Sequence, residues 1–259
     1  MTNILERIIE NKKKEVEQQK AVVSISDLEK NISDIQVNSF KEALIQSSTG
    51  IIAEFKRRSP SRDWIFKDAK IEDVIPLYSK NGAAAISVLT DMDFFGGNLN
   101  DLNQARGLTT TPLLRKDFVI DEYQIYQAKK AEASAILLIA SALTVDETKQ
   151  FAAKAKELGL DVLLEIHNEM ELGHINSNVD VVGVNNRNLA TFVTDVQVSF
   201  DLVDKIPNEF VKISESGISQ PQTVKELRQA GFKGFLMGEN FMKTNNPGKA
   251  LEEFIGELL

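Results

Sequence analysis

Eight short apolar runs recur along the chain at roughly regular intervals, separated by longer, more polar segments. The runs are IIAEF (51–55), AAISVL (84–89), TPLLR (111–115), SAILLIA (134–140), DVLLEI (161–166), DVVGV (180–184), FVKIS (210–214) and GFLMG (234–238). They are largely continuous rather than alternating, which is the pattern of parallel strands buried on both faces. The pattern therefore predicts eight parallel strands.

The segments between the apolar runs have the periodicity of helices. The clearest of them, TVDETKQFAAKAKELGL (144–160), begins at Thr144 and has Glu147 three residues later, which is the capping-box pattern. Residues 70–83 and 219–232 show the same kind of helical spacing and end at a glycine or an Asn-Gly pair. Helices are therefore predicted to alternate with the strands.

Eight strand–helix units with short connections indicate an α/β fold, a single-domain (β/α)8 TIM barrel over residues 49–259. A doubly wound open sheet is the alternative, but it usually needs fewer strands and a glycine-rich first turn. The chain contains no G-x-G-x-x-G motif and no P-loop. Residues 1–48 precede the first strand and are predicted to form an N-terminal helical extension packed on the barrel, so we expect one domain over residues 1–259.

The N-terminal segment MTNILERIIENKKKEVEQQK has the pattern of a charged amphipathic helix. Ile4, Leu5, Ile8 and Ile9 mark its apolar face, and the basic run 12–14 is expected to form its solvated side. The segment lacks the apolar core of a signal peptide, and no run in the chain approaches the roughly 20 apolar residues of a membrane span. We therefore expect a cytoplasmic protein with no membrane partner.

Composition limits the chemistry that the chain can perform. Its 259 residues are 42% hydrophobic and 26% charged, which is typical of a soluble globular protein. There is no cysteine, which excludes disulfides, zinc thiolates and a cysteine nucleophile. The net charge of −8 argues against a nucleic-acid partner but leaves room for a local cationic pocket. His167 and His174 lack metal-ligand spacing, so surface or structural roles are expected for both.

Polar residues gather where barrel active sites form, at the carboxyl ends of the strands. In IIAEFKRRSPS (51–61), Glu54 and Lys56 are two residues apart, so both are expected to face the barrel axis while Phe55 faces outward. Lys116 follows the third strand and Glu165 ends the fifth, which predicts that ammonium and carboxylate groups converge in one volume. A structural ion pair near the rim is the alternative interpretation of Glu54 and Lys56.

The last two strands end in sequences that favour anion binding. SESGIS follows the seventh strand and MGEN the eighth, and barrel phosphate sites are commonly built from these two loops. Gly217 and Gly238 would let backbone amides approach an anion closely. Phe94, Phe95 and Phe118 follow the second and third strands, where they would either wall an aromatic substrate or cap the barrel core.

Seven motifs, in one order, resemble the indole-3-glycerol-phosphate synthase family: IIAEFKRRSPS, SVLTDMDFFGG, PLLRKDFVIDEYQIYQA, LLEIHNE, VGVNNRNL, ISESGI and LMGENFM. The resemblance runs from about residue 50 to the end of the sequence. It implies a lyase that converts 1-(2-carboxyphenylamino)-1-deoxyribulose 5-phosphate to indole-3-glycerol phosphate, with loss of carbon dioxide and water, in tryptophan biosynthesis. The resemblance implies no metal and no organic cofactor, and a phosphorylated small molecule is the expected ligand of a monomer.

The resemblance also implies a role for each matching residue. Lys116 would be the general acid that protonates the substrate carbonyl, and Glu165 and Lys56 the proton-transfer pair of the dehydration, with Lys56 also available to contact an anionic group. The supporting catalytic and carboxylate-holding positions are Glu54, Glu215, Asn185 and Arg187. The phosphate-contacting positions are Ser59, Ser216, Gly217, Gly238 and Glu239, and the apolar wall is formed by Phe94, Phe118, Leu137 and Leu189. Burial is expected to lower the pKa of the acid lysine and so ease its proton donation. Which lysine serves which step stays open.

Three other functions are considered. Phosphoribosylanthranilate isomerase is another phosphate-binding barrel, but it would need a Cys–Asp pair and the chain has no cysteine. A Schiff-base aldolase would use Lys116 or Lys56 as its nucleophile. A non-catalytic barrel that only binds a phosphorylated ligand is disfavoured, since a binding protein gains little from burying additional charges.

Overall fold

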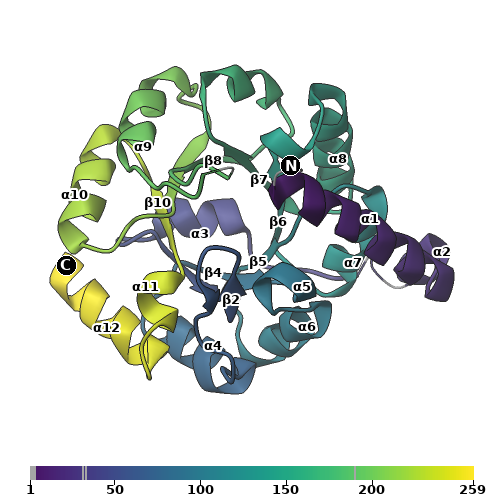
Figure 1. Ribbon diagram of the computed structural model, residues 1–259, viewed down its shortest axis with the longest axis horizontal. Coiled ribbons are helices and arrows are strands. Elements are labelled where there is room, and N and C mark those ends of the chain that lie inside the picture. The colour runs from purple at the N-terminus through teal and green to yellow at the C-terminus, as the bar shows by residue number, and fades with distance from the viewer. Residues whose placement is uncertain (1–3, 31, 33, 190) are drawn as a thin grey trace.

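The computed structural model describes residues 4–30, 32, 34–189 and 191–259, and its centre is a closed barrel of eight parallel strands (Figure 1). Around the barrel the order is β1-β10-β9-β8-β7-β6-β5-β4. The barrel strands are β1 (Ile51–Phe55), β4 (Ala85–Leu89), β5 (Leu113–Lys116), β6 (Ala135–Ile139), β7 (Asp161–Ile166), β8 (Val181–Asn185), β9 (Val211–Glu215) and β10 (Gly234–Met237). The TIM-barrel prediction is confirmed, and each predicted run overlaps its strand.

Helices surround the barrel and connect consecutive strands (Figure 1). The outer helices are α4 (Ile71–Lys80), α6 (Leu99–Leu108), α7 (Glu122–Lys130), α8 (Val145–Glu157), α9 (Gln197–Leu202), α10 (Pro221–Ala230) and α12 (Pro247–Leu258). The short ones are α5 (Met92–Phe95), α11 (Glu239–Met242), η1 (Ala140–Ala142), η2 (Glu169–His174) and η3 (Val203–Lys205). The predicted capping box of α8 is present, because Thr144 accepts from the Glu147 amide and the Glu147 side chain accepts from the Thr144 amide.

Apolar side chains form one core outside the barrel wall and another inside it. Phe55 packs in the outer core between strands and helices, and Ile52 packs in the inner core, as strand alternation predicts. Helix α3 (Phe40–Gln46) lies across the amino end of the barrel, where Phe40 and Leu44 join the inner core (Figure 1). With this end covered, the carboxyl ends of the strands are left as the open face.

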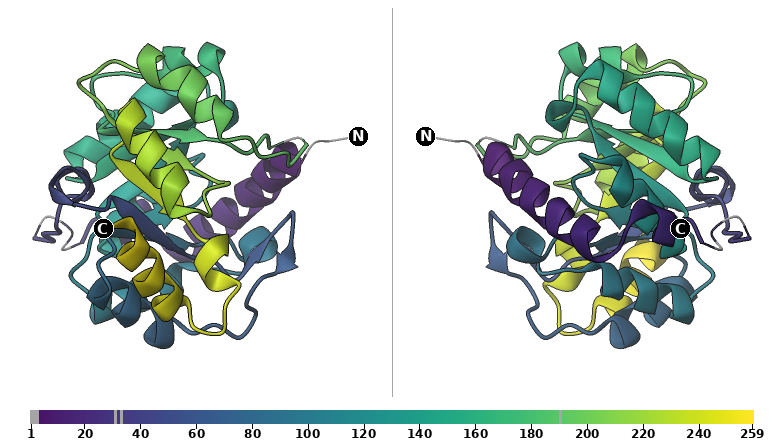
Figure 2. Two further views of the ribbon diagram at one scale, coloured as in Figure 1. Left: turned by 90° about the vertical axis from the view of Figure 1, so that its left-hand side faces the viewer. Right: turned by 90° about the vertical axis from the view of Figure 1, so that its right-hand side faces the viewer.

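Helix α1 (Ile4–Val22) extends along one side of the molecule toward the open face (Figure 2), and α2 (Ile25–Leu28) follows it. Ile8 and Val16 of α1 are buried at a spacing that places them on one helix face. Near its start, α1 contributes to the wall of the cavity described below. The predicted N-terminal extension is thus helical and packs on the barrel.

Lys12 contradicts the expected solvated side of α1, because its side chain is 1% exposed. Its Nζ lies 3.0 Å from Asp91 Oδ2 and 3.0 Å from Asp117 Oδ1, at the ends of β4 and β5. A buried ammonium is stable only when opposite charges compensate its lost hydration, and these two carboxylates provide that compensation together with Glu15 of α1, whose Oε2 lies 2.7 Å away. Lys12 therefore fastens α1 to the open face of the barrel.

Candidate active site

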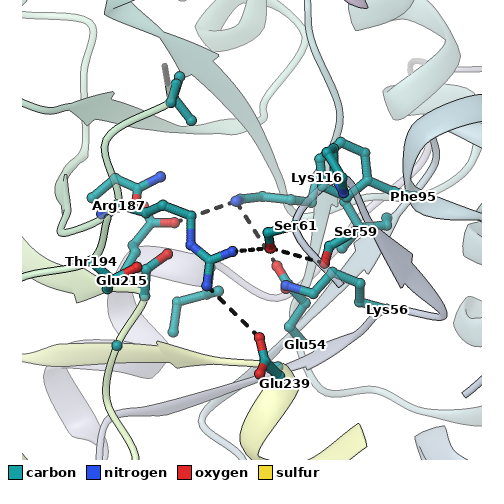
Figure 3. A pocket seen from close by; sticks show the side chains of 18 of the residues that line it. Glu54, Lys56, Ser59, Ser61, Phe95, Lys116, Arg187, Thr194, Glu215 and Glu239 are labelled. Atoms are coloured by element: carbon teal, nitrogen blue, oxygen red, sulfur yellow. Dashed lines mark hydrogen bonds and ion pairs between the residues drawn. The ribbon is translucent and has the colours of Figure 1, made fainter. Parts of the chain in front are cut away.

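A cavity of about 470 Å³ opens at the carboxyl ends of the barrel strands, and Figure 3 shows part of its lining. Every candidate residue except Phe94 lines it. These residues are Glu54, Lys56, Ser59, Lys116, Phe118, Leu137, Glu165, Asn185, Arg187, Leu189, Glu215, Ser216, Gly217, Gly238 and Glu239. Residues from different strand ends, far apart in the sequence, are thus gathered around one space.

Lys116, at the end of β5, lies among three buried carboxylates. Its Nζ is 3.4 Å from Glu215 Oε2, 3.5 Å from Glu165 Oε2 and 3.9 Å from Glu54 Oε2. On the far side of Glu54, Lys56 Nζ lies 2.6 Å from Glu54 Oε1 (Figure 3). The predicted convergence of ammonium and carboxylate groups is therefore present, and it joins β1, β5, β7 and β9.

The expected lowering of the Lys116 pKa is wrong. Burial alone would lower the pKa of Lys116, but the carboxylates of Glu215, Glu165 and Glu54 raise it above the ordinary value for lysine. The carboxylates stabilise the ammonium form more than the lost hydration destabilises it. Lys116 is therefore fully protonated at neutral pH.

Glu165 and Glu215 are both buried but have pKa values on opposite sides of the ordinary glutamate value. Burial opposes the ionisation of Glu165, yet Lys116 and His167 lower its pKa to about 2. Burial raises the pKa of Glu215 to about 7, and the charges of Glu165 and Glu54 add to that shift against the opposing effect of Lys116. A pair of carboxyl groups with separated pKa values can supply a base and a proton carrier in one site.

Two glycines make space for the buried carboxylates. A Cβ on Gly183 of β8 would lie 2.3 Å from Glu215 Oε1, and a Cβ on Gly238 would lie 2.6 Å from Glu54 Oε1. Real side-chain atoms do not approach so closely, so any larger residue at these positions would displace a carboxylate. Gly238 thus contributes to the site through its neighbour Glu54 as well as through its own backbone.

A buried polar network holds the end of β5 that carries Lys116. Arg115 precedes Lys116 in the chain. Its Nη2 donates to Asp117 Oδ2 at 3.0 Å, and its Nη1 donates to the Gln124 carbonyl at 2.6 Å. The Thr90 hydroxyl donates to the same Asp117 oxygen at 2.6 Å. Since adjacent strand residues face opposite sides, the network fixes the backbone while leaving Lys116 free to face the cavity.

The loops after β9 and β10 border the opposite part of the cavity. Ser216 and Gly217 both have positive φ, 67° and 75°, so the chain turns sharply at this point. A Cβ on Gly217 would lie 2.6 Å from Thr194 Cγ2, and glycine is required there by both space and conformation. Ser59, Gly238 and Glu239 line the same cavity.

The connection after β1 contains a short hairpin that the sequence pattern did not predict. Its strands are β2 (Arg58–Ser59) and β3 (Asp63–Trp64), paired antiparallel. At its tip, Ser61 accepts a hydrogen bond from Nη1 of Arg187 (Figure 3). Nε of Arg62 lies 3.1 Å from Glu239 Oε1. The hairpin therefore joins the opposite wall of the cavity through charged side chains.

One side of the cavity is apolar and includes part of α1. Phe118 and Leu137 line it as predicted, together with Ile8 of α1. Phe95 lines the cavity in place of Phe94, and its ring centroid lies 5.9 Å from that of Phe118. The two residues share the helix α5, where successive side chains are about 100° apart, so only one of them can face the cavity.

His167, for which a surface or structural role was expected, lies beside Glu165. Its Nε2 is 3.3 Å from Glu165 Oε1, and its side chain is 12% exposed. His167 is two residues after Glu165 in chain order, and this i, i+2 spacing is the sequence signal that places both side chains on one side of an extended segment. A search for metal-ligand spacing does not detect a histidine of this kind, because His167 contacts an active-site carboxylate and not a metal.

Residues 4–30, 32, 34–189 and 191–259 contain neither a metal-binding cluster nor a membrane-spanning helix. Within these ranges, no three His, Asp or Glu side chains form a group that could hold a metal ion. None of the helices in the same ranges has the length and apolar character needed to cross a membrane.

Comparison with known proteins gives one consistent family. Residues 5–254 match the model of the family described as indole-3-glycerol phosphate synthase. An indole-3-glycerol phosphate synthase of Bacteroides thetaiotaomicron is 54% identical over 256 residues, covering 98% of this chain and 98% of that protein. One from Alkaliphilus metalliredigens is 43% identical, covering 96% of this chain and 97% of that protein. The similarity includes most of the N-terminal extension.

Solved structures with low sequence identity share the fold. A chain of the tryptophan synthase complex from Pyrococcus furiosus superimposes with a TM-score of 0.61 at 16% identity, over 82% of this chain and 98% of that one. Thiamine phosphate pyrophosphorylase from the same organism gives a TM-score of 0.60 at 14% identity, over 83% of this chain and 99% of that one. At such identity the likeness shows the barrel fold alone.

Proposed function

The chain belongs to the indole-3-glycerol phosphate synthase family, and from this premise we propose which of its residues carry out the reaction. It is a carbon–carbon lyase of tryptophan biosynthesis that acts on a phosphorylated small molecule, 1-(2-carboxyphenylamino)-1-deoxyribulose 5-phosphate. The reaction closes the indole ring and releases carbon dioxide and water. The observation that carries the proposal is the position of Lys116 among three carboxylates, with Lys56 beside one of them.

Ring closure needs an acid, and we assign that role to Lys116. The ring carbon that bears the carboxylate attacks the substrate carbonyl carbon, and the carbonyl π electrons move to oxygen. That oxygen takes a proton from the Lys116 ammonium as its negative charge develops. Because the neighbouring carboxylates keep Lys116 protonated, the acid is ready whenever substrate binds.

Decarboxylation follows without a further acid. The bond from the ring carbon to the carboxylate breaks, and its electron pair restores the aromatic ring as carbon dioxide leaves. Dehydration then removes the hydroxyl formed in the first step. Glu165 takes a proton from the substrate and Lys56 gives one to the departing hydroxyl, so that two protons are donated and one is taken in each turnover. Net uptake of one proton balances the loss of the substrate carboxylate as carbon dioxide.

The other two carboxyl groups support the lysines. Glu54 holds Lys56 through its 2.6 Å contact and also accepts a hydrogen bond from Ser87 at 3.3 Å. Glu215 lies 3.4 Å from Lys116 and has a pKa near neutrality, so it is suited to return a proton to Lys116 between turnovers. Asn185 of β8 also lines the cavity and is proposed to hold the substrate carboxylate or hydroxyls.

The substrate is proposed to lie with its phosphate at the β9 and β10 loops and its aromatic ring against the apolar wall. The proposed phosphate contacts are Ser59, Ser216, Gly217, Gly238 and Glu239, the last two through backbone amides. The proposed ring contacts are Phe95, Phe118, Leu137 and Leu189. Arg187 lines the same cavity, 3.8 Å from Glu239, and is proposed to reach the substrate carboxylate.

A Schiff-base mechanism is less well supported. An amine nucleophile must be unprotonated, whereas the carboxylates around Lys116 raise its pKa above the ordinary value. We further propose that the chain is one domain over residues 1–259 and a cytoplasmic monomer. Sedimentation equilibrium of the purified protein tests the oligomeric state, and a dimer mass would contradict it.

The assigned roles are tested by following carbon dioxide release and indole fluorescence in the same single-turnover experiment. Wild-type protein should release both products. Glu165→Gln should still release carbon dioxide but form indole at least 100-fold more slowly, since its base acts only in dehydration. Glu157→Gln removes an exposed carboxylate on α8 and is the matched control, expected to behave as wild type. Equal loss of both signals in Glu165→Gln would contradict the assignment.

A further inference from the structure

His167 lies between two carboxylates, one inside the cavity wall and one behind it. Its Nε2 lies 3.3 Å from Glu165 Oε1, and its Nδ1 lies 3.1 Å from Glu171 Oε2. Its backbone amide donates to the same Glu171 oxygen at 2.8 Å, and the Asn168 side chain donates to the other at 2.9 Å. The Glu171 carboxylate is thus fixed in place by residues of its own segment.

This arrangement favours one protonation state, with Nε2 of His167 within ion-pair distance of Glu165 rather than in an aligned hydrogen bond. A neutral imidazole has one N–H donor, and its other ring nitrogen carries a lone pair. With a carboxylate oxygen at each nitrogen of His167, a neutral ring would turn a lone pair toward a negative charge. Only the doubly protonated imidazolium presents an N–H to both Glu165 and Glu171.

We propose that His167 is a positioning residue, a permanently protonated imidazolium that fixes the orientation of the Glu165 carboxylate for proton abstraction. Glu165 is divided between two cations, since its Oε1 faces His167 and its Oε2 lies 3.5 Å from Lys116. The result is a line of alternating charges from Glu171 through His167 and Glu165 to Lys116. The effect on catalysis rests on the role proposed above for Glu165.

The charges around His167 are consistent with this state. The titratable groups in contact with it are Glu165 on β7 and Glu171 on η2, and both are anionic partners. Although burial opposes protonation, these two carboxylates raise the pKa of His167 to about 10. Lys116 on β5 contacts the other oxygen of Glu165.

The other histidine of the chain is a matched control. His174 ends the same η2 segment, and its Nδ1 lies 2.8 Å from the Thr148 hydroxyl of α8, so it is held by a neutral group. Burial lowers the pKa of His174 below the ordinary value, and it has no role in the proposed chemistry. The chain has 2 histidines, so each substitution leaves one signal to observe.

The protonation state is tested by ¹⁵N NMR of the imidazole ring in full-length His174→Asn protein. Both ring nitrogens of His167 should keep imidazolium shifts from pH 5.5 to pH 8.5. Titration with a midpoint at or below about 6.5, the ordinary histidine value, would overturn the proposal. In Glu171→Gln protein the midpoint should fall, because one of the two stabilising carboxylates has been removed. This measurement needs no substrate.

The positioning role is tested by single-turnover kinetics of His167→Asn. Asparagine retains a donor toward Glu171 but removes the charge and the contact with Glu165. Carbon dioxide release should stay within about threefold of wild type, while indole formation slows by about 10- to 100-fold, as expected for a displaced catalytic group. His174→Asn should change neither rate. Should His167→Asn fold poorly, His167→Gln is measured in its place with the same expectation.

The outcomes separate this inference from the proposed reaction. Unchanged rates in a His167 variant, or equal slowing of both products, would overturn the positioning role. If Glu165→Gln lost carbon dioxide release, the proposed role of Glu165 would be wrong. The NMR measurement would still test the protonation state of His167, because it needs no substrate. Carbon dioxide release followed by delayed indole formation in the His167 variant, with both rates normal in His174→Asn, supports the inference.

Discussion

Replacing Lys12 by methionine removes the single cation that joins α1 to Asp91 and Asp117, both buried. In the wild type Lys12 Nζ contacts each carboxylate at 3.0 Å. Asp117 retains Arg115 at 3.0 Å in the variant, but Asp91 keeps only the Phe94 amide at 2.9 Å. The variant therefore leaves one buried carboxylate without a compensating charge.

The magnitude follows from that loss. Removing one partner of a buried ion pair costs about 3–5 kcal/mol of unfolding free energy. For a chain of this size, each kcal/mol lowers the melting temperature by about 2–4 °C, so the expected decrease is roughly 6–20 °C. Because Ile4, Leu5 and Ile8 of α1 line the cavity, loosening of the helix should also raise KM.

Urea unfolding, thermal melting and steady-state kinetics measure these effects. Lys14→Met is the matched control, since Lys14 lies on the exposed side of the same helix and should change little. The double variant Lys12→Met/Asp91→Asn removes the unpaired carboxylate as well and should recover much of the loss. If Lys12→Met melts within 2 °C of Lys14→Met, Lys12 does not stabilise the buried carboxylates.

Two further predictions concern the buried Glu215. Gly183→Ala should lower kcat by about tenfold or more, because the added Cβ would lie 2.3 Å from Glu215 Oε1. Gly256→Ala is the control and should leave kcat unchanged, because the added Cβ meets no neighbouring described side chain within 4 Å. Retained kcat in Gly183→Ala would show that the carboxylate has room to move. Relative to the wild type, Glu215→Gln should be more stabilising at pH 8 than at pH 4. The pKa of Glu215 rises from 4.5 unfolded to about 7 folded, so its contribution to the stability of the wild type falls as pH increases between those values, by about 3 kcal/mol. Thermal unfolding of both proteins across that range measures the difference, and parallel curves would contradict the raised pKa.

Much of the fold follows from local sequence patterns. Continuous apolar runs such as DVLLEI at 161–166 identify barrel strands because both faces of a parallel strand are buried. Strand alternation then places Glu54 inward and Phe55 outward, as observed. The hairpin of β2 and β3 was not predicted, since its strands are only two residues long and have no apolar pattern.

The parts of the site that escaped prediction depend on neighbours distant in sequence. Lys12 resembles a solvated helix residue until Asp91 and Asp117 are brought beside it by the barrel. The direction of the Lys116 pKa shift is likewise set by three carboxylates from other strands, and not by burial alone. Residue identity predicts which groups are present, but charge compensation in three dimensions decides their state.

The role of Lys116 as the acid of ring closure is tested most directly by carbon dioxide release from Lys116→Met in a single turnover. Since decarboxylation follows ring closure, the variant should release carbon dioxide at least 100-fold more slowly than wild type while keeping its circular dichroism spectrum. Lys56→Met, which lacks the proposed dehydration acid, should release carbon dioxide at close to the wild-type rate and form indole slowly. Carbon dioxide release by folded Lys116→Met within tenfold of wild type would contradict the account.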